Sequence, residues 1–431
     1  MTSMQHKFGA LDLIRAGLQD LDRARTLFDE LHNDGIDDDR MRLLLATLEK
    51  ACDPDIALSN LVDIIKVMQS QGKDFTNIIA DENSFVRLIT VLGVSDEMGK
   101  LMRFRPELVE AAANDACESH LYNHEQRRAH VLKSVGADPN DHTMPTASLP
   151  LAEAATALRK TYRKQLAAIM AQDATANDPI EIQPRISTEL SDLADAALEG
   201  ALAIARHEVD GSEHVRFAII GMGKLGAQEL NYVSDVDLIY VVEPADMDTN
   251  GMALSRIGTK IATTLQRVCQ SVIMGVAEPT LWQIDGGLRP EGKDGPLVRR
   301  LESHEAYYEQ WAENWEFQAL LKARPVAGDT DLGQAYMDMT RPFVWTASKR
   351  DNFVYDCQQM RKRVEDLIPN PLKDREIKLG RGGLRDVEFT VQMLQLVHGR
   401  SDEALRTSST LESLQALAEG GYVSRKQAKK L

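Results

Sequence analysis

The sequence predicts an α+β protein, in which a small mixed β-sheet domain lies between two mostly helical regions. Two observations support this prediction. Short β-rich runs cluster in the middle of the chain, at 214–221, 235–240 and 281–285. On either side of them, apolar residues recur at the 3.6-residue spacing of amphipathic helices, as they do in residues 58–68.

Three regions follow one another along the chain. Residues 8–135 predict successive amphipathic helices, and residues 136–148, rich in Pro, Asp and Asn, predict a boundary. From about residue 301 the chain is again mostly helical, and residues 384–399 and 405–418 each carry an apolar stripe at the spacing of an amphipathic helix. The expected domains are therefore a helical domain at 1–150, a sheet domain at 151–330 and a second helical domain at 331–431.

Within the sheet domain, long helices are expected around the strands. Helices at 150–172 and 187–208 are joined by the proline-containing segment 173–185 and lead into the first strand. A further helix at 251–273 separates the second strand from the third. The expected order is thus two helices, two strands, one helix and a third strand.

The composition of the chain disfavours several classes of protein. It has 50 basic and 66 acidic side chains and a net charge of -16, whereas a nucleic-acid partner would require a basic surface. The four cysteines are scattered, as in a reduced cytosolic protein. No apolar run approaches the length of a membrane-spanning helix, and no signal peptide is evident. We expect a soluble, cytoplasmic protein with neither a nucleic-acid nor a membrane partner.

The most informative segment begins with a glycine-rich turn directly after the first strand. Gly221, Gly223 and Gly226 allow the backbone to turn tightly and to approach a phosphate, because no Cβ stands in the way. Lys224 lies inside the turn, where it would meet the charge of that phosphate. A glycine pattern alone is weak evidence, so the prediction of a phosphate site depends on the residues after the turn.

An Asp-x-Asp pair lies in the next apolar strand. Asp235 and Asp237 are two residues apart, so both side chains point to one face of the strand. Adjacent carboxylates repel each other unless a cation lies between them, and Mg²⁺ is typically held by a few carboxylates plus substrate phosphates. The same letters occur at 53–55 and 329–331, but in a turn and a loop rather than an apolar strand. We therefore interpret the pair as metal ligands rather than as a polar strand edge.

A third acid ends the next β-rich run. Asp285 would complete the metal site, and Arg289, four residues later, would stabilise charge on a transferring phosphoryl group. Two metal ions in such a site stabilise the attacking and leaving oxygens of an in-line displacement. The alternative is that Asp285 is a turn aspartate before two glycines.

Three cations further along the chain are candidates for phosphate binding. Lys322 and Arg324 are expected two residues apart on a helix and hence on different faces, so that one reaches the nucleotide while the other forms a structural ion pair. Arg385 follows Gly382 and Gly383 at an expected helix N-terminus, which is a favourable place for an anion.

These motifs resemble those of the bifunctional glutamine synthetase adenylyltransferases. The run Gly-Met-Gly-Lys-Leu-Gly-x3-Leu-Asn-Tyr-x-Ser-Asp-Val-Asp-Leu at 221–238 is similar to the signature of that family. Further similar segments occur in the family's order, at 53–61, 288–298, 313–324 and 378–389. Gly287 departs from the pattern, since many members carry Arg there, which leaves less positive charge beside the third acid.

The resemblance implies a nucleotidyltransferase fold of the polymerase β type and assigns roles to the candidate residues. It implies Mg²⁺ bound by Asp235, Asp237 and Asp285, with Arg289 as a further catalytic residue. The residues that it implies in binding nucleotide or phosphate are Gly221, Gly223, Lys224, Gly226, Ser234, Lys322, Arg324 and Arg385.

The resemblance also implies a function, with alternatives that the residues leave open. The single acid motif and the long helical leader are similar to the first half of family members, which removes AMP from a tyrosine of glutamine synthetase by phosphorolysis and forms ADP. The same site would support ATP-dependent adenylylation of that tyrosine. A non-catalytic module that senses nucleotide or the PII signalling protein is an alternative of another class. Because the chain ends in a helix-like stretch, we also expect a truncated or split polypeptide.

Overall fold

The computed structural model describes residues 8–73, 75, 78, 81–113, 122–246, 250–373 and 375–430. The chain divides into two compact units. Unit 1 contains Met1–Arg127 and Lys160–Glu189, and unit 2 contains Arg128–Arg159 and Leu190–Leu431. The structure confirms the α+β class, because the described residues form mostly helices together with a five-stranded mixed sheet. The division into domains at 1–150, 151–330 and 331–431 stays a prediction.

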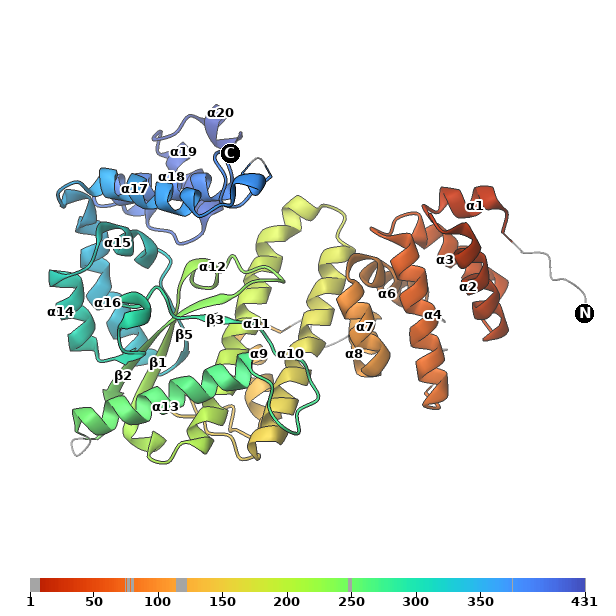
Figure 1. Cartoon of the computed structure of the whole chain (residues 1–431), viewed down its shortest axis with the longest axis horizontal. Coiled ribbons are helices and arrows are strands. Elements are labelled where there is room, and N and C mark those ends of the chain that lie inside the picture. The colour runs from red at the N-terminus through yellow and green to blue at the C-terminus, as the bar shows by residue number, and fades with distance from the viewer. Residues whose placement is uncertain are drawn as a thin grey trace, which may run out of the picture. The chain divides into compact units, whose positions relative to one another are not determined.

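Unit 1 begins with a series of short helices, drawn in red to orange in Figure 1. They are α1 (Ala10–Arg15), α2 (Leu21–Asn33), α3 (Asp38–Leu48), α4 (Pro54–Ser70), α6 (Glu82–Val94), α7 (Asp96–Phe104) and α8 (Pro106–Ala113). An acidic or hydroxyl side chain at the N-cap starts most of them: Asp53, for example, accepts a hydrogen bond from the backbone N–H of Ile56. The predicted apolar stripe of residues 58–68 is confirmed, since it forms the buried face of α4.

Further helices come next along the chain, α9 (His124–Ser134), α10 (Leu151–Ala174) and α11 (Pro179–Glu208). The predicted linker at 173–185 is wrong in extent, because α11 already begins at Pro179. Asp178 accepts hydrogen bonds from the N–H groups of Ile180 and Glu181, and this N-cap starts the helix at Pro179. Proline at the first helical position has no N–H that needs a partner. Pro184 is accommodated inside the helix.

The sheet of unit 2 has the strand order β3-β2-β1-β5, with β4 also paired to β2. Its strands are β1 (Val215–Gly221), β2 (Val236–Pro244), β3 (Ile284–Asp285), β4 (Val298–Arg299) and β5 (Arg324–Gly328). β1 is antiparallel to β2 and β5, whereas β2 is parallel to β3 and β4. The three predicted strands are present, although the run at 281–285 shrinks to two residues.

Helices cover both faces of the sheet (Figure 1). α13 (Gly251–Gln270) packs against the face that carries Tyr240 and Val242, since Gln266 approaches the Tyr240 hydroxyl and Gly258 lies against Val242. α14 (Leu301–Gln310), α15 (Asn314–Leu320) and α16 (Thr330–Thr346) share a core with the opposite face. Residues of even number in β1 and odd number in β2 point to this core, and Asp235 and Asp237 have the same parity.

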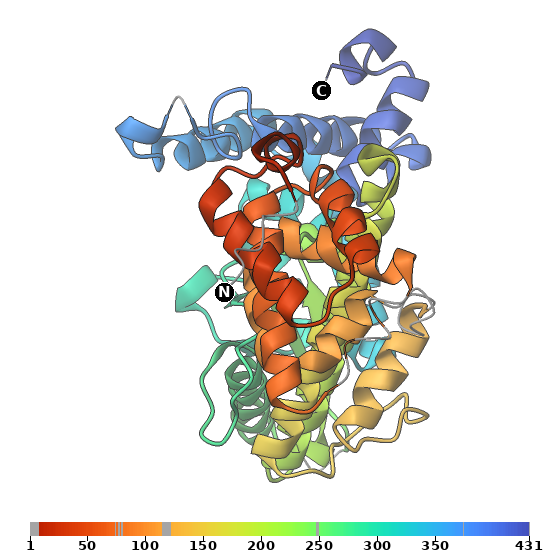
Figure 2. The same ribbon diagram turned by 90° about the vertical axis from the view of Figure 1, so that its right-hand side faces the viewer.

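A helical segment follows the sheet, drawn in blue in Figures 1 and 2, where α17 (Phe353–Asp366) and α18 (Leu384–His398) lie side by side. The predicted helix at 384–399 is therefore confirmed. The predicted helix at 405–418 starts later, as α19 (Thr410–Glu419), because Ser409 caps it by accepting from the N–H of Glu412. The last helix within the described residues is α20 (Arg425–Ala428).

Candidate active site

The glycine turn lies directly against one of the predicted metal ligands. β1 ends at Gly221, and a single helical turn, α12 (Gly223–Gly226), follows. Gly223 has a φ of +54°, and a Cβ at this position would lie 2.5 Å from Oδ2 of Asp237. A Cβ on Gly226 would lie 1.8 Å from the carbonyl oxygen of Lys322. Both positions therefore require glycine, which lets the backbone approach the acid strand closely.

The sheet brings the three predicted acids together. Asp237 in β2 lies in parallel register with Asp285 in β3, and Asp235 comes just before β2. Asp235 is exposed, whereas Asp237 and Asp285 are half-buried. Burial, together with the nearby carboxylates of Asp235 and Asp285, raises the pKa of Asp237 to about 6. The cluster is thus an electrostatically costly arrangement of like charges.

These residues suit a divalent cation. Carboxylate oxygens are the donors that Mg²⁺ prefers, and a cation between them would remove the repulsion that raises the pKa of Asp237. The third acid is held in place locally, because Oδ1 of Asp285 accepts a 2.7 Å hydrogen bond from the N–H of Gly287. A Cβ at Gly287 would lie 2.9 Å from that oxygen. Glycine at 287 therefore favours the close turn beside Asp285.

A cavity of about 250 Å³ opens beside the acids. It is lined by parts of the glycine turn and β2, by the loop after β3, and by α15, α17 and α18. Its lining residues are Gly223, Asp237, Leu288, Trp315, Gln318, Ala319, Lys322, Met360, Val364, Arg385, Glu388, Phe389 and Gln392. Three predicted binding residues, Gly223, Lys322 and Arg385, thus share one cavity with Asp237.

Lys322 and Arg385 line this cavity, and Lys224 and Lys378 lie close to them. The pKa of Lys224 is lowered, mainly by burial and further by the nearby charge of Lys378, with smaller effects of Arg385 and Lys322 that Glu388 partly offsets. The positive charges of Arg385 and Lys378 also act on Asp237. Among the residues that the structure describes, the side chains of Lys224 and Lys378 have no hydrogen-bond or ion-pair partner, and such cations favour binding of an anion. Lys378 was missed as a site residue, although it lies in the same family-like motif as Arg385.

Lys322 is the most enclosed of these cations, with an exposed fraction of 5%. Its Nζ lies 3.0 Å from Glu229, 2.7 Å from Glu388 and 3.1 Å from the Thr410 hydroxyl. The same Glu229 accepts hydrogen bonds from the N–H and the hydroxyl of Thr410, at the start of α19. Lys322 therefore joins the segment after the glycine turn to α18 and α19, even though it also lines the cavity.

Arg324 lies in a strand, and its predicted position on a helix is wrong. α15 ends at Leu320, and Arg324 opens β5 because Pro325 disfavours a helical conformation at the residue before it. Its guanidinium lies 2.6 Å from the buried carboxylate of Asp195 and donates to the carbonyls of Leu225 and Gly226. Arg324 therefore stabilises the glycine turn through hydrogen bonds to two of its carbonyl groups.

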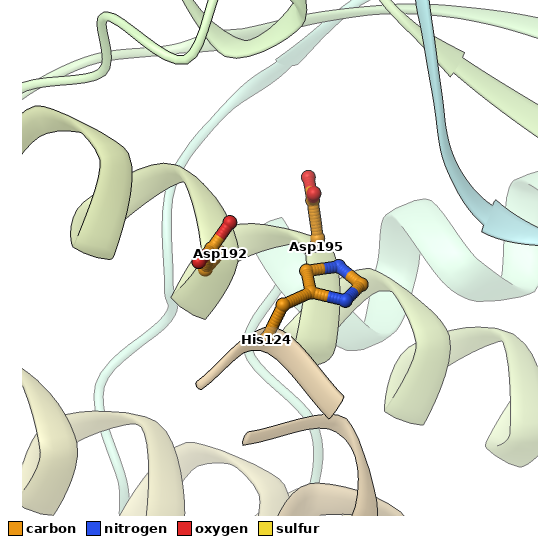
Figure 3. Close-up of side chains that lie close together, drawn as sticks. All are labelled: His124, Asp192 and Asp195. Atoms are coloured by element: carbon orange, nitrogen blue, oxygen red, sulfur yellow. The ribbon is translucent and has the colours of Figure 1, made fainter. Parts of the chain in front are cut away.

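Two acids of α11 hold groups that flank the turn. Asp192 and Asp195 are three residues apart and project from the same side of the helix (Figure 3). Asp195 pairs with Arg324, and Asp192 accepts a 3.2 Å hydrogen bond from Gln228, just after the turn. This support was not visible in the sequence, because it joins residues more than thirty positions apart.

Arg289 and Ser234 are among the predicted site residues that do not line the cavity. The guanidinium of Arg289 donates to the carbonyls of Gly286, Lys293 and Gly295, so it closes the loop that follows Asp285. Ser234 is half-buried in the segment before β2. The cations that influence Asp237 are instead Arg385 and Lys378.

No helix within the described ranges is both long and apolar enough to cross a membrane. Comparisons with known proteins then place the chain. A family profile described as Glutamate-ammonia ligase adenylyltransferase matches residues 85–339, and one described as GlnD PII-uridylyltransferase matches residues 358–431.

Similar curated proteins carry the name "Bifunctional glutamine synthetase adenylyltransferase/adenylyl-removing enzyme". One from Bifidobacterium longum (strain DJO10A) is 76% identical over 428 residues, covering 99% of this chain and 40% of the relative. One from Cutibacterium acnes is 44% identical over 422 residues, covering 98% of this chain and 42% of the relative. The chain thus spans about two fifths of the length of these relatives. On the family profile that matches more than half of it, the chain belongs to the glutamate-ammonia ligase adenylyltransferase family.

Proposed function

We propose that this chain removes AMP from the adenylylated tyrosine of glutamine synthetase, with inorganic phosphate as the acceptor and ADP as the product. The observation that supports this most is the placement of Asp235, Asp237 and Asp285 beside a cavity that Asp237 lines. Two cations lie close by, Lys224 and Lys378, and their side chains have no partner in the described part of the chain. Phosphorolysis brings two anionic phosphate groups together. A metal ion on the acids and the positive charges of the two lysines would both offset the negative charge of these groups.

The acids and the cations would divide the work. Asp235, Asp237 and Asp285 would hold Mg²⁺, which supplies charge stabilisation to the oxygens of an in-line displacement. Lys224, Lys378 and Arg385 would bind the incoming phosphate and hold it against the repulsion of the adenylyl phosphate. Positioning of this kind converts a bimolecular reaction into an effectively unimolecular one. The glycine turn, supported by Arg324, would let the backbone approach the phosphates.

The reaction exchanges one phosphorus–oxygen bond for another. An oxygen of inorganic phosphate forms a bond to the adenylyl phosphorus, while the bond from that phosphorus to the tyrosine oxygen breaks. The tyrosine oxygen takes up the proton that the attacking hydrogen phosphate gives up and becomes the free hydroxyl, and the adenylyl group leaves bonded to that phosphate, as ADP. In this scheme Lys322, which is fully engaged by Glu229 and Glu388, positions α18 and with it Arg385.

The partners follow from the same proposal. Glutamine synthetase is the protein substrate, and the PII signalling protein is a regulator. Support for PII comes from the similarity of residues 358–431 to a PII-uridylyltransferase family, and this segment contributes α17 and α18 to the cavity.

The proposal is tested by incubating the purified chain with adenylylated glutamine synthetase, phosphate and Mg²⁺. We expect AMP to be lost from the tyrosine only when phosphate is present, with an equal amount of ADP formed. In a parallel assay, unmodified glutamine synthetase and labelled ATP should give no labelled tyrosine. Labelling there would show that this chain adenylylates, and no product in either assay would support a nucleotide-sensing or PII-sensing module instead.

A further inference from the structure

The cavity beside the acids has an apolar part that phosphate chemistry does not explain. Five of its lining side chains are large, apolar and half-buried. They are Leu288, Trp315, Met360, Val364 and Phe389. Anionic phosphates gain nothing from such surfaces, whereas the flat faces of a nucleobase pack well on aromatic and aliphatic side chains.

Two buried glutamines add a polar pair to these walls. Gln318 and Gln392 are only 3% and 7% exposed, and Nε2 of Gln318 donates a 2.8 Å hydrogen bond to Oε1 of Gln392. Oε1 of Gln318 is buried without a hydrogen-bond partner among the described residues. Nε2 of Gln392 also forms no hydrogen bond within the described ranges but, unlike Oε1 of Gln318, it is not fully buried. Each amide therefore keeps one unused group, an acceptor on Gln318 and a donor on Gln392.

One acceptor and one donor next to each other complement the Watson–Crick edge of adenine. The N6 amino group of adenine donates a hydrogen bond, and its N1 accepts one. The ring of an adenylylated tyrosine offers neither group, because its only oxygen is esterified to phosphate. The polar pair therefore favours the base rather than the tyrosine as the occupant of this part of the cavity.

We propose that the Gln318–Gln392 pair reads the N6/N1 edge of the adenine in the adenylyl group, while Trp315 and Phe389 pack against the base. This inference rests on the proposed function, since the acids and cations of the same cavity fix the phosphate end. It makes the two glutamines specificity-determining residues. Hypoxanthine, which has a carbonyl oxygen at position 6 and an N–H at position 1, presents the opposite pattern to the same pair.

The test compares the affinities of ADP, IDP and pyrophosphate for the whole chain in the presence of Mg²⁺. Wild type should bind ADP at least about tenfold more tightly than IDP, because mispaired buried polar groups are costly. Replacing both partners together, by Gln318→Leu with Gln392→Leu, leaves no orphaned amide and is expected to keep the fold. In this double variant the ratio of ADP to IDP affinity should fall to about one, while pyrophosphate affinity stays unchanged.

Gln395→Leu is the matched control. Gln395 is a buried glutamine of α18, the helix that also carries Gln392. Its Nε2 donates hydrogen bonds to the carbonyls of Leu405 and Thr407, and it does not line the cavity. Its replacement should lower the melting temperature but keep the preference for ADP. Equal binding of ADP and IDP by wild type, tighter binding of IDP, or an unchanged ratio in a folded double variant would each overturn the proposal.

Trp315 provides a second, independent readout. Trp315→Leu should weaken ADP binding by about tenfold and leave pyrophosphate binding unchanged, because stacking acts on the base alone. Trp311 lies four residues earlier and is 72% exposed outside the cavity, so Trp311→Leu should change neither affinity. Equal ADP affinity of the two tryptophan variants would contradict stacking on Trp315.

Turnover of adenylylated glutamine synthetase, measured on the same preparations, separates the two proposals. Turnover without discrimination between ADP and IDP would overturn the inference about the base and leave the proposed function intact. Discrimination between ADP and IDP without turnover would overturn the proposed function and leave the inference about the base intact.

Discussion

Two groups of charged residues in unit 2 differ in how their charges are balanced. Lys322 lies between Glu229 and Glu388, and Arg324 pairs with Asp195, so the charges of this structural network are matched. Asp235, Asp237 and Asp285 lie beside one another, and their repulsion and burial raise the pKa of Asp237.

We interpret this difference as one between residues that stabilise the fold and residues that would bind a ligand. A buried, matched pair is costly to break, but it leaves little capacity to bind anything else. A cluster of like charges is tolerated in a folded protein where a bound ligand of opposite charge compensates it. For these three acids we expect that ligand to be a metal ion, bound together with substrate phosphates. Charge balance, rather than residue type, therefore distinguishes Lys322 and Arg324 from Lys224 and Lys378.

The largest expected effect is on turnover when one of the unmatched acids is neutralised. Asp235→Asn, Asp237→Asn and Asp285→Asn should each lower turnover by about a thousandfold or more, because each removes a ligand charge from the metal site. Circular dichroism should show an unchanged fold. The matched control is Asp331→Asn, which alters the exposed second acid of another Asp-x-Asp pair, at the start of α16. Turnover within about tenfold of wild type in an acid variant would contradict the metal site.

A second contrast, between local and distant contacts, decides how much of the structure the sequence could predict. The glycine turn, the acid strand and the helix at 384–399 depend on local patterns, and each was predicted within a few residues. β5 was missed because its neighbours in the sequence look helical, and only its antiparallel pairing with β1 across the sheet defines it.

The ion pairs were harder to predict than the elements. The contact of Lys322 with Glu229 joins residues 93 positions apart and that of Arg324 with Asp195 joins residues 129 positions apart, and a single sequence contains no signal for them. For the same reason Arg289 looked free to act on phosphate, whereas its donors are used by its own loop.

A smaller effect should distinguish the matched cation from an unmatched one. Lys322→Met should lower the free energy of unfolding by about 3–5 kcal/mol, because it removes the buried cation that two half-buried carboxylates share. Lys378→Met should change it by less than about 0.5 kcal/mol, because Lys378 is exposed and unpaired among the described residues. Urea denaturation measures both values.

The kinetic effect of the Lys378 variant should be selective. We expect the KM for phosphate to rise by about tenfold with little change in kcat, as for the loss of one charge-assisted contact to the bound anion. Similar stability losses in the Lys322 and Lys378 variants would show that the distinction between matched and unmatched charge is wrong. An unchanged KM for phosphate would remove Lys378 from the site.

The smallest expected effect concerns the stability cost of the acid cluster itself. Asp237 has a folded-state pKa of about 6, above its ordinary value of 3.8, so the folded protein binds the proton more tightly than the unfolded chain does. The resulting stability is fully present below pH 3.8 and is lost as the pH rises through about 6. In EDTA at pH 7.5, Asp237→Asn should therefore unfold with a free energy about 1–3 kcal/mol higher than that of wild type, and the gap should close by pH 4. Mg²⁺ should stabilise wild type but not the variant. A metal-free wild type that is at least as stable as the variant at pH 7.5 would mean that the three acids do not repel one another as their register implies.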